Sequence, residues 1–322
     1  MSTGLRLDQR LALHPATLAV RRWFDSSSMP ATVSASADRI DWLRVVPFIG
    51  LHLTCIGVIW VGVSAFAVGV ALALYVLRMF AITGFYHRYF SHRAFRTSRA
   101  VQFLFALIGT ASVQRGPLWW AAHHRHHHRH ADTPEDPHSP RQHGFFWSHM
   151  GWFLTQRGFR TDTTRIVDLL RFPELRLLDR YDVLVPIGLA CLLYFGGGRL
   201  AAAHPELHTS GAQLLIWGFF ISTVVLFHVT VTINSIAHRW GTRRFDTNDD
   251  SRNNALLAVL TFGEGWHNNH HHFPGSARQG FAWWEVDLTW YVLRGLAALG
   301  IVWDLKPVPV GLVRRRASGD AC

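Results

Sequence analysis

Lysine, cysteine and charged residues as a whole are scarce in this chain of 322 residues. Lys306 is the one lysine among 32 basic residues, so the other basic residues are arginines. Charged residues make up 16% of the chain, against about 25% in a typical soluble protein. Together with 49% hydrophobic residues, this shortage argues against a disordered chain, a coiled coil and two ordinary soluble domains.

The few cysteines argue against a protein held together by disulfides. Cys55, Cys191 and Cys322 lie far apart, and none has the spacing of a zinc site, a redox motif or a disulfide framework. We also expect no signal peptide in residues 1–25, because they contain four arginines and two aspartates but no continuous apolar stretch. Residues 26–37 have the composition of a linker, and Met29 is an alternative start.

The sequence does contain long apolar runs. Residues 46–82 are almost wholly apolar, which is too long for one span because a bilayer needs about 20 helical residues. Turn residues within this run, and within a second apolar region at about 183–233, predict that each forms a pair of helices. The sequence thus predicts an all-α integral membrane protein with four spans in two hairpins, at roughly 45–61, 64–84, 183–203 and 212–233.

The arginines predict how these spans are oriented. Six basic residues lie in 1–44, fourteen in 85–182 and ten in 234–322, whereas the two linkers on the other side hold only Arg199. Basic residues concentrate in cytoplasmic segments, so we expect a multi-pass protein of the inner membrane with both termini in the cytoplasm. The net charge of +11 then reflects topology, and nucleic-acid binding is not expected because no recognisable module carries a basic patch.

This topology divides the chain into three parts. Residues 1–44 form a cytoplasmic segment and linker, and residues 301–322 form a tail. Between them, residues 45–300 form one domain, in which the spans carry a helical cytoplasmic cap made of 85–182 and 234–300.

The 21 histidines are arranged in clusters within the predicted cap. Residues three or four apart share a helix face, which applies to two H-x-x-H-H motifs and to an asparagine four residues before a lone histidine. His87 and His92 are five apart, about 140° around an α-helix, so they can face one site only if the helix ends or bends between them. Imidazole suits iron, copper, zinc and nickel, and nine imidazoles suffice for two ions. The candidate ligands are His87, His92, His124, His127, His128, His238, His267, His270 and His271.

Each cluster alone has a simpler interpretation. The run at 123–130 is typical of low-complexity metal binding, and His238 alone is typical of a surface or capping residue. The recurrence of the motifs at the ends of spans that reach the same membrane face favours a shared site. His52 and His228 lie within spans, where we expect neutral side chains bonded to a neighbouring helix.

In combination and order, these motifs resemble those of the membrane-bound fatty acyl desaturases, in the stearoyl-CoA Δ9 branch. They read H-R-Y-F-S-H at 87–92, H-R-H-H-H at 124–128, N-S-I-A-H at 234–238 and G-E-G-W-H-N-N-H-H-H-F-P at 263–274. The resemblance covers roughly residues 45–290. It implies four spans under a cytoplasmic cap and a non-haem di-iron centre held by the nine candidate histidines. It also implies that Asn234 holds an iron-bound water.

The activity implied by the resemblance is insertion of a cis double bond, at the Δ9 position, into a saturated acyl chain. The reaction uses O2 and two electrons from an external donor. The chain has no H-P-G-G haem motif, so we expect a separate ferredoxin or cytochrome b5 with its reductase. An acidic donor would suit the arginine-rich cytoplasmic face, although topology explains those arginines as well.

The second histidine box departs from the acyl-CoA branch. Animal enzymes read W-A-R-D-H there, with an asparagine shortly before, and these polar residues help to hold CoA. This chain has Ala122 and His123 in place of the arginine and aspartate, and Arg115 at the asparagine position. The acyl chain is therefore expected to be carried either by CoA or by a phospholipid, with an acyl carrier protein as a further alternative.

Double-bond position requires a stop for the methyl end of the chain. Tyr75 and Met79 are one helical turn apart, about 18 and 12 Å along the helix from His87. About nine methylenes beyond the reacting carbons extend a similar distance, so we expect these two side chains to close the substrate tunnel; the alternative is that they face lipid or a neighbouring helix.

Two other functions fit parts of the pattern. A di-iron hydroxylase of an alkyl or lipid substrate uses the same chemistry and would give an alcohol instead of an alkene. A membrane metal transporter would place its ligands midway across the spans, whereas these clusters lie at the span ends or outside them.

Overall fold

The computed structural model describes residues 21, 23–28, 39–309 and 311. These residues are mostly helical, and the sheet that they contain has two strands of two residues each. The prediction of a helical protein is therefore confirmed. Met29 and most of the segments predicted at 1–44 and 310–322 lie outside the described residues.

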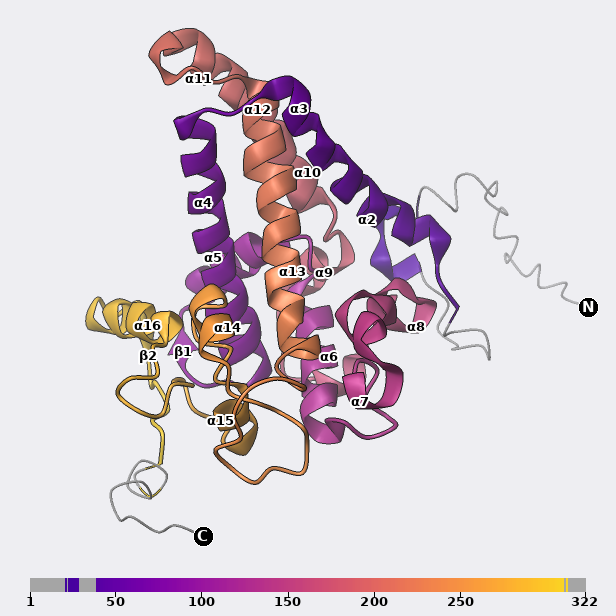
Figure 1. The fold of residues 1–322 in the computed structure, drawn as a ribbon, viewed down its shortest axis with the longest axis vertical. Coiled ribbons are helices and arrows are strands. Elements are labelled where there is room, and N and C mark those ends of the chain that lie inside the picture. The colour runs from indigo at the N-terminus through magenta and orange to yellow at the C-terminus, as the bar shows by residue number, and fades with distance from the viewer. Residues whose placement is uncertain (1–20, 22, 29–38, 310, 312–322) are drawn as a thin grey trace, which may run out of the picture.

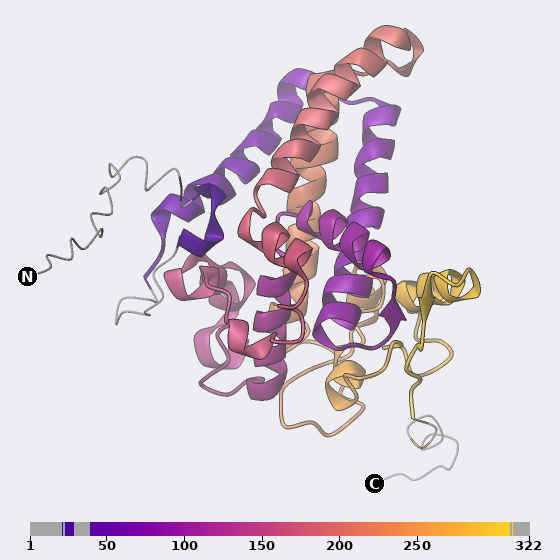
Figure 2. The ribbon, with the colours of Figure 1, turned by 180° about the vertical axis from the view of Figure 1, so that it is seen from behind.

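Four long helical rods occupy one end of the molecule, and the fourth packs against the other three (Figure 1). Figure 2 shows from behind how the third rod crosses the fourth. The rods comprise, in chain order, α2 (Trp42–Thr54) with η2 (Cys55–Gly57) and α3 (Val58–Val61); α4 (Ala65–Phe80) with η3 (Ala81–Ser91); α10 (Leu184–Cys191) with η7 (Leu192–Gly196) and α11 (Gly197–Ala203); and α12 (Gly211–Leu214) with η9 (Leu215–Ile221) and α13 (Ser222–Ser235).

Three of the rods are long and apolar enough to cross a membrane, at Ala65–Ser91, Leu184–Ala203 and Gly211–Ser235. The apolar part of the first rod, Val45–Val61, is shorter, at 17 residues. The predicted bounds agree with the third and fourth rods to within two residues. The second rod continues beyond the predicted end at residue 84 to Ser91. Its last part, Ala81–Ser91, is wound as a π-helix.

The break between the first two rods lies where turn residues predicted it. Gly62 has a φ of 66°, a conformation that glycine adopts without a steric penalty. Ser64 then caps α4, since its hydroxyl accepts a hydrogen bond from the backbone N–H of Ala67.

The other end of the molecule is a cap of shorter helices beneath the rods (Figure 1). Its core forms where η3 packs against α5 and α6, and Phe85, Tyr86 and Phe90 are fully buried there. The helices of the cap are α5 (Arg99–Thr110), α6 (Pro117–His130), α7 (Pro140–His143), α8 (Gln156–Phe159), α9 (Pro173–Arg180), α14 (Ala255–Leu260), α15 (His267–His272) and α16 (Leu288–Ala298), with short turns η4 (Trp147–Gly151), η5 (Trp152–Leu154) and η6 (Thr163–Arg165).

Both described chain ends are attached to this cap. Near the N-terminus, Asp25 accepts hydrogen bonds from Arg180 at 2.7 and 2.9 Å, just before η1 (Ser26–Ser28). Near the C-terminus, β2 (Val302–Trp303) pairs antiparallel with β1 (Arg96–Thr97). The cap thus includes short pieces of both segments that the sequence assigned to a linker and a tail.

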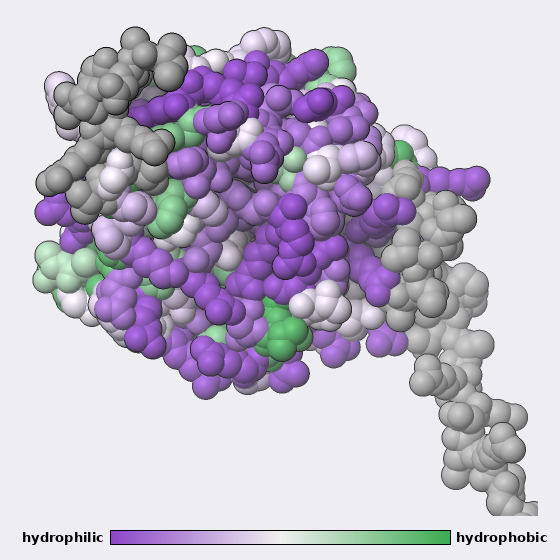
Figure 3. Space-filling model, turned by 90° about the horizontal axis from the view of Figure 1, so that it is seen from below, coloured by the Kyte–Doolittle hydropathy of each residue, from purple (hydrophilic) through white to green (hydrophobic). Residues whose placement is uncertain are grey.

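The two ends of the molecule differ in surface character. Large apolar side chains such as Ile59, Trp60, Leu72 and Leu192 are exposed on the rods. Seen from below, the cap is mostly hydrophilic (Figure 3). A soluble protein would bury such side chains, so this contrast suits rods surrounded by lipid and a cap in water.

Candidate metal centre

The π-helix η3 places His87 and His92 on one face. A π-helix has hydrogen bonds between residues five apart, and here the backbone N–H of His92 donates to the carbonyl of His87 at 3.2 Å. The two rings lie 4.9 Å apart between centroids. The spacing of His87 and His92 required the helix to bend or end between them. The wider π-helical winding and the helix end at Ser91 meet that requirement.

Seven further histidines come from three other places. Helix α6 begins at Pro117, a residue favoured in the first helical turn, and presents three histidines on one face. The short helix α15 presents three more, and one follows the end of α13. In that order they are His124, His127 and His128; His267, His270 and His271; and His238.

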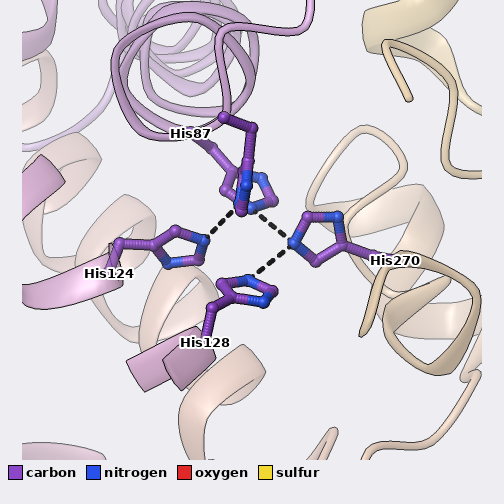
Figure 4. A group of neighbouring side chains, drawn as sticks. His87, His124, His128 and His270 are labelled. Carbon is purple, nitrogen blue, oxygen red and sulfur yellow. Dashed lines mark hydrogen bonds between the residues drawn. The ribbon is translucent and has the colours of Figure 1, made fainter. Parts of the chain in front are cut away.

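Five of the nine predicted ligands form one cluster, which we call the five-histidine cluster: His87, His92, His124, His128 and His270. One nitrogen from each ring lies within 4.8 Å of the others. The Nε2 atom of His270 is 3.0 Å from that of His87 and 2.9 Å from that of His128. Figure 4 shows His87, His124, His128 and His270 directed towards a common centre, with His124 opposite His270.

The remaining four form the four-histidine cluster: His127, His238, His267 and His271. Their ligand atoms also lie within 4.8 Å of one another. The Nε2 atoms of His238 and His267 are 3.0 Å apart. The two clusters adjoin, because the ring of His128 stacks on that of His271 with centroids 4.5 Å apart.

Four carboxylates hold the outer nitrogens of these rings. Glu264 pairs with Nδ1 of His87, and Asp132 accepts from Nδ1 of His238 at 2.8 Å. Asp136 and Asp249 do the same for His127 and His271, at 3.0 and 2.8 Å. Since a carboxylate only accepts, each of these rings carries its proton on Nδ1 and turns the lone pair of Nε2 into its cluster.

Burial keeps the other five rings neutral. It lowers the pKa of His92, His124 and His128 well below the ordinary value, and neighbouring imidazoles lower it further. The pKa of His267 and that of His270 fall for the same reason. Neutral imidazole is the form that binds metal ions, so the clusters are prepared as ligands.

The donor set fits a transition metal. Both clusters consist of imidazole nitrogens alone, whereas magnesium and calcium require oxygen ligands. The carboxylates on the outer nitrogens are the partners that metal-bound histidines commonly have. The residues present therefore fit two adjacent metal ions, and imidazole alone does not distinguish iron from zinc.

Two cavities adjoin the clusters. The larger, of about 620 Å3, extends between α2, α10 and the fourth rod, and the smaller is about 50 Å3. Trp120, His124, Thr230 and Asn234 line both of them. Asn234, predicted to hold a water, thus lies where the two cavities meet beside the five-histidine cluster.

The two predicted tunnel residues are placed differently. Met79 is fully buried and lines the small cavity together with His87. Tyr75 is half-buried and lines neither of the two cavities; its hydroxyl donates to the backbone carbonyl of Leu260 at 2.7 Å.

His52 and His228 each bond to a neighbouring helix, as predicted. The Nε2 atoms of His52 and His228 lie 2.9 Å apart and link α2 to α13. His149, in η4, extends the contact, because its Nε2 lies 3.1 Å from Nδ1 of His228. These three rings lie apart from the two clusters.

The sequence motifs did not reveal the four carboxylates. Glu264 belongs to the quoted G-E-G-W-H motif, which assigns no role to it, and Asp136 lies outside all four histidine motifs. Asp132 and Asp249 also lie outside the histidine motifs. The available signal was the concentration of acidic residues just after the second box and before the last one, in a chain with only 21 acidic residues.

The positions that depart from the acyl-CoA pattern have partners within the protein. Arg115 pairs with Asp182 at 2.6 Å, and the Nε2 atom of His123 lies 3.0 Å from the backbone carbonyl of Arg160. Arg115 and His123 both line the larger cavity.

Comparisons with known proteins agree with this geometry. The family model described as fatty acid desaturase matches residues 40–304. A protein of Anabaena variabilis named sn-1 stearoyl-lipid 9-desaturase is 38% identical over 276 residues, which cover 85% of this chain and 96% of that protein.

Two plant proteins show similar identity. One from Anemone leveillei, named an acyl-CoA 5-desaturase, is 37% identical and covers 93% of this chain and 92% of its own length. One from Arabidopsis thaliana, named delta-9 acyl-lipid desaturase 1, is 36% identical and covers 86% of this chain and 87% of its own length. The names of these relatives thus differ in both double-bond position and acyl carrier.

Proposed function

The chain belongs to the fatty acid desaturase family, and on that premise we propose that it inserts a cis double bond at the ninth carbon of a saturated acyl chain. As a member of this family it is an oxidoreductase. The acyl chain is carried by a phospholipid or by CoA. The observation that carries the proposal is the pair of adjoining histidine clusters at the junction of two cavities.

The nine histidines would hold two iron ions. The five-histidine cluster would bind one and the four-histidine cluster the other. When bound, the irons supply the oxidising power needed to break an unactivated C–H bond, which no side chain can supply. The reaction as a whole consumes O2, two electrons and two protons, removes two hydrogens from the acyl chain and releases two waters.

The protein's own residues would position the ligands and exclude solvent. The four carboxylates fix the direction in which His87, His127, His238 and His271 present Nε2. The ring of Trp120, which lines both cavities, would help to keep bulk water away from their junction. Asn234 would orient a water where the cavities meet.

The acyl chain would cross this junction. Its carboxyl half would lie in the larger cavity and its methyl end would point towards the smaller one. Met79 lines that smaller cavity, which supports its proposed role as a stop. Tyr75 would act one turn farther along the same helix.

The proposed topology has four spans in two hairpins. The 17-residue helix Val45–Val61 would be the first span, near the short end of the range of about 17–25 residues. The arginine distribution supports cytoplasmic termini and a cytoplasmic cap in the inner membrane. Residues 45–300 would then form the catalytic domain, and a ferredoxin, or cytochrome b5 with its reductase, would deliver the electrons to the cap.

Expression in a host that lacks its own desaturase tests the proposal. Fatty acids are analysed by mass spectrometry within each lipid class, so that an alkene is distinguished from an alcohol. We expect a new cis monoene with wild type and none with His270→Ala. His130→Ala serves as the control, because His130 lies on α6 but belongs to neither cluster. Product formation by His270→Ala, or an alcohol as the main product, would contradict the proposal.

A further inference from the structure

The larger cavity has walls that lie within the rods. Gly50 and Leu51 of α2, Ile187 of α10 and Phe220 of η9 line it. Each of these residues lies within a segment that is apolar and proposed to span the membrane. The cavity therefore extends from the cap to the level of the hydrocarbon region.

The inner end of this cavity reaches the five-histidine cluster. His124 and Trp120 line it, and the Nε2 atom of His124 lies 2.8 Å from that of His92. A molecule that fills the cavity can therefore touch the cluster without passing through the polar face of the cap.

The outer end opens on the side of the molecule. Trp23, Phe24 and Ile187 line the cavity and yet are 42%, 38% and 43% exposed, so the cavity reaches the surface beside them. Ile187 belongs to α10, and the exposed Pro47, which also lines the cavity, belongs to α2. The mouth is thus bounded by these two helices.

The surface around the mouth is apolar. On α2, Val46, Ile49 and Leu53 are exposed, and on α10 so is Leu184. Trp23 and Phe24 come from the segment that precedes the first rod, and aromatic side chains of this kind are common at membrane interfaces. A mouth with such an apolar rim faces lipid acyl chains.

The cavity also contains hydrogen-bond donors that lack acceptors. Within the described residues, the Nη2 atom of Arg115 and the Nε1 atom of Trp152 are buried without a hydrogen-bond partner. Both residues line the cavity. Unsatisfied buried donors are costly, and an ester group, which has acceptor oxygens and no donor, matches them.

We propose that the mouth between α2 and α10 admits the acyl chain of a membrane glycerolipid directly from the bilayer. This inference rests on the proposed desaturase function and specifies its substrate and the route that the substrate takes. The lipid head group stays at the membrane surface beside Trp23 and Phe24, while the esterified chain enters sideways and reaches His124. A soluble acyl thioester would have to cross lipid to use the same mouth.

Two glycines provide a matched pair of variants. Gly50 lines the cavity, and Gly188 lies on α10 outside its lining. A Cβ atom added to either glycine meets nothing within 4 Å, so a side chain can start from both positions without a clash at its first atom. Gly50→Phe should fill the cavity near its mouth, and Gly188→Phe should leave it open. Ile187→Trp narrows the mouth from the other helix and provides a second variant should Gly50→Phe fail to fold.

The test is photo-crosslinking of the full-length protein in lipid nanodiscs. The probe is phosphatidylcholine with a diazirine on its sn-1 chain, and labelled peptides are identified by mass spectrometry. We expect labels on lining residues of the cavity in wild type and in Gly188→Phe. We expect labelling to fall by about tenfold in Gly50→Phe and Ile187→Trp, because the added ring occupies the space of the chain.

The labelling results decide between lateral entry and its absence. Absence of label from the cavity in wild type, or equal cavity labelling in all variants, would overturn lateral entry. Because labelling requires neither iron nor an electron donor, it is independent of turnover. Cavity labelling of a wild-type protein that forms no alkene would support the lipid site while contradicting the proposed desaturation.

Discussion

His127 and His271 turn the same ring nitrogen towards each other, with their Nε2 atoms 3.4 Å apart. The Nδ1–H of each ring donates a hydrogen bond to a carboxylate, that of Asp136 for His127 and that of Asp249 for His271. In the neutral rings both Nε2 atoms therefore carry lone pairs. Two lone pairs at this distance cannot bond to each other. A cation between them, either a proton or a metal ion, satisfies both, and two lone pairs that face one point are what a metal site requires.

Asp249 should therefore tune metal affinity without touching the metal. We predict that Asp249→Asn weakens metal binding by about 10- to 100-fold, because the amide holds the His271 ring less firmly and makes it a poorer base. Asp246→Asn is the control, since the Asp246 side chain is fully exposed and faces Arg243. Titration of the metal-free protein with Co2+ measures both affinities; equal affinities would refute the role assigned to Asp249.

Met79 should limit the length of the substrate. We predict that Met79→Ala enlarges the small cavity beside His87 and shifts the product profile towards longer chains. Leu77→Ala, on the same helix but 43% exposed, should leave the profile unchanged. Gas chromatography of the monoenes formed by each variant measures the shift. If the Met79 and Leu77 variants give the same profile, the methyl end of the chain lies elsewhere.

Asp179 should make stability depend on pH. Burial raises its pKa to about 6, and nearby Asp182 contributes, although the N–H of Trp119 opposes the shift. The folded protein then holds a proton that the unfolded chain releases above its ordinary value of 3.8. This group therefore stabilises the fold at low pH, and we predict that its contribution falls between about pH 4 and pH 6, by on the order of 2 kcal/mol.

Comparison with Asp179→Asn isolates this contribution, because other titrating groups are common to both proteins. Thermal unfolding in detergent should show the wild type losing stability relative to the variant as the pH rises through that window. A difference that stays constant with pH would mean that Asp179 has an ordinary pKa.

The bond between His52 and His228 should hold the first rod to the fourth. We predict that His52→Leu lowers the free energy of unfolding by about 1 kcal/mol, because it leaves the Nε2 atom of His228 without its partner. His204→Leu removes an exposed histidine from the linker between the third and fourth rods and should have little effect. Equal thermal stability of the two variants would show that the bond contributes nothing measurable.

The rods and the histidines were predictable because both follow from local patterns. Apolar runs located the third and fourth rods to within two residues, and turn residues near Gly62 divided the first long run into two helices. Spacings of three and four residues placed His124, His127 and His128 on one face. These signals are contained within one or two helical turns of sequence.

Other features depend on contacts between distant segments. The sequence required a break or bend between His87 and His92, but the π-helical winding comes from the packing of η3 against α5 and α6. The partner of His238, Asp132, lies 106 residues away, and no local pattern reveals it. The cavity mouth likewise arises only when α2 and α10 come together in three dimensions.

Iron content and product formation in one sample test the central claim most directly. The purified protein is loaded with Fe2+ under reducing conditions, its iron per chain is measured, and it is then supplied with O2, an electron donor and a saturated acyl lipid. We predict two irons per chain and a cis monoene for wild type, with less iron and no monoene for His270→Ala. A wild-type protein that forms the monoene without iron, or a His270→Ala protein that keeps both irons and full activity, would contradict the assignment of the nine histidines.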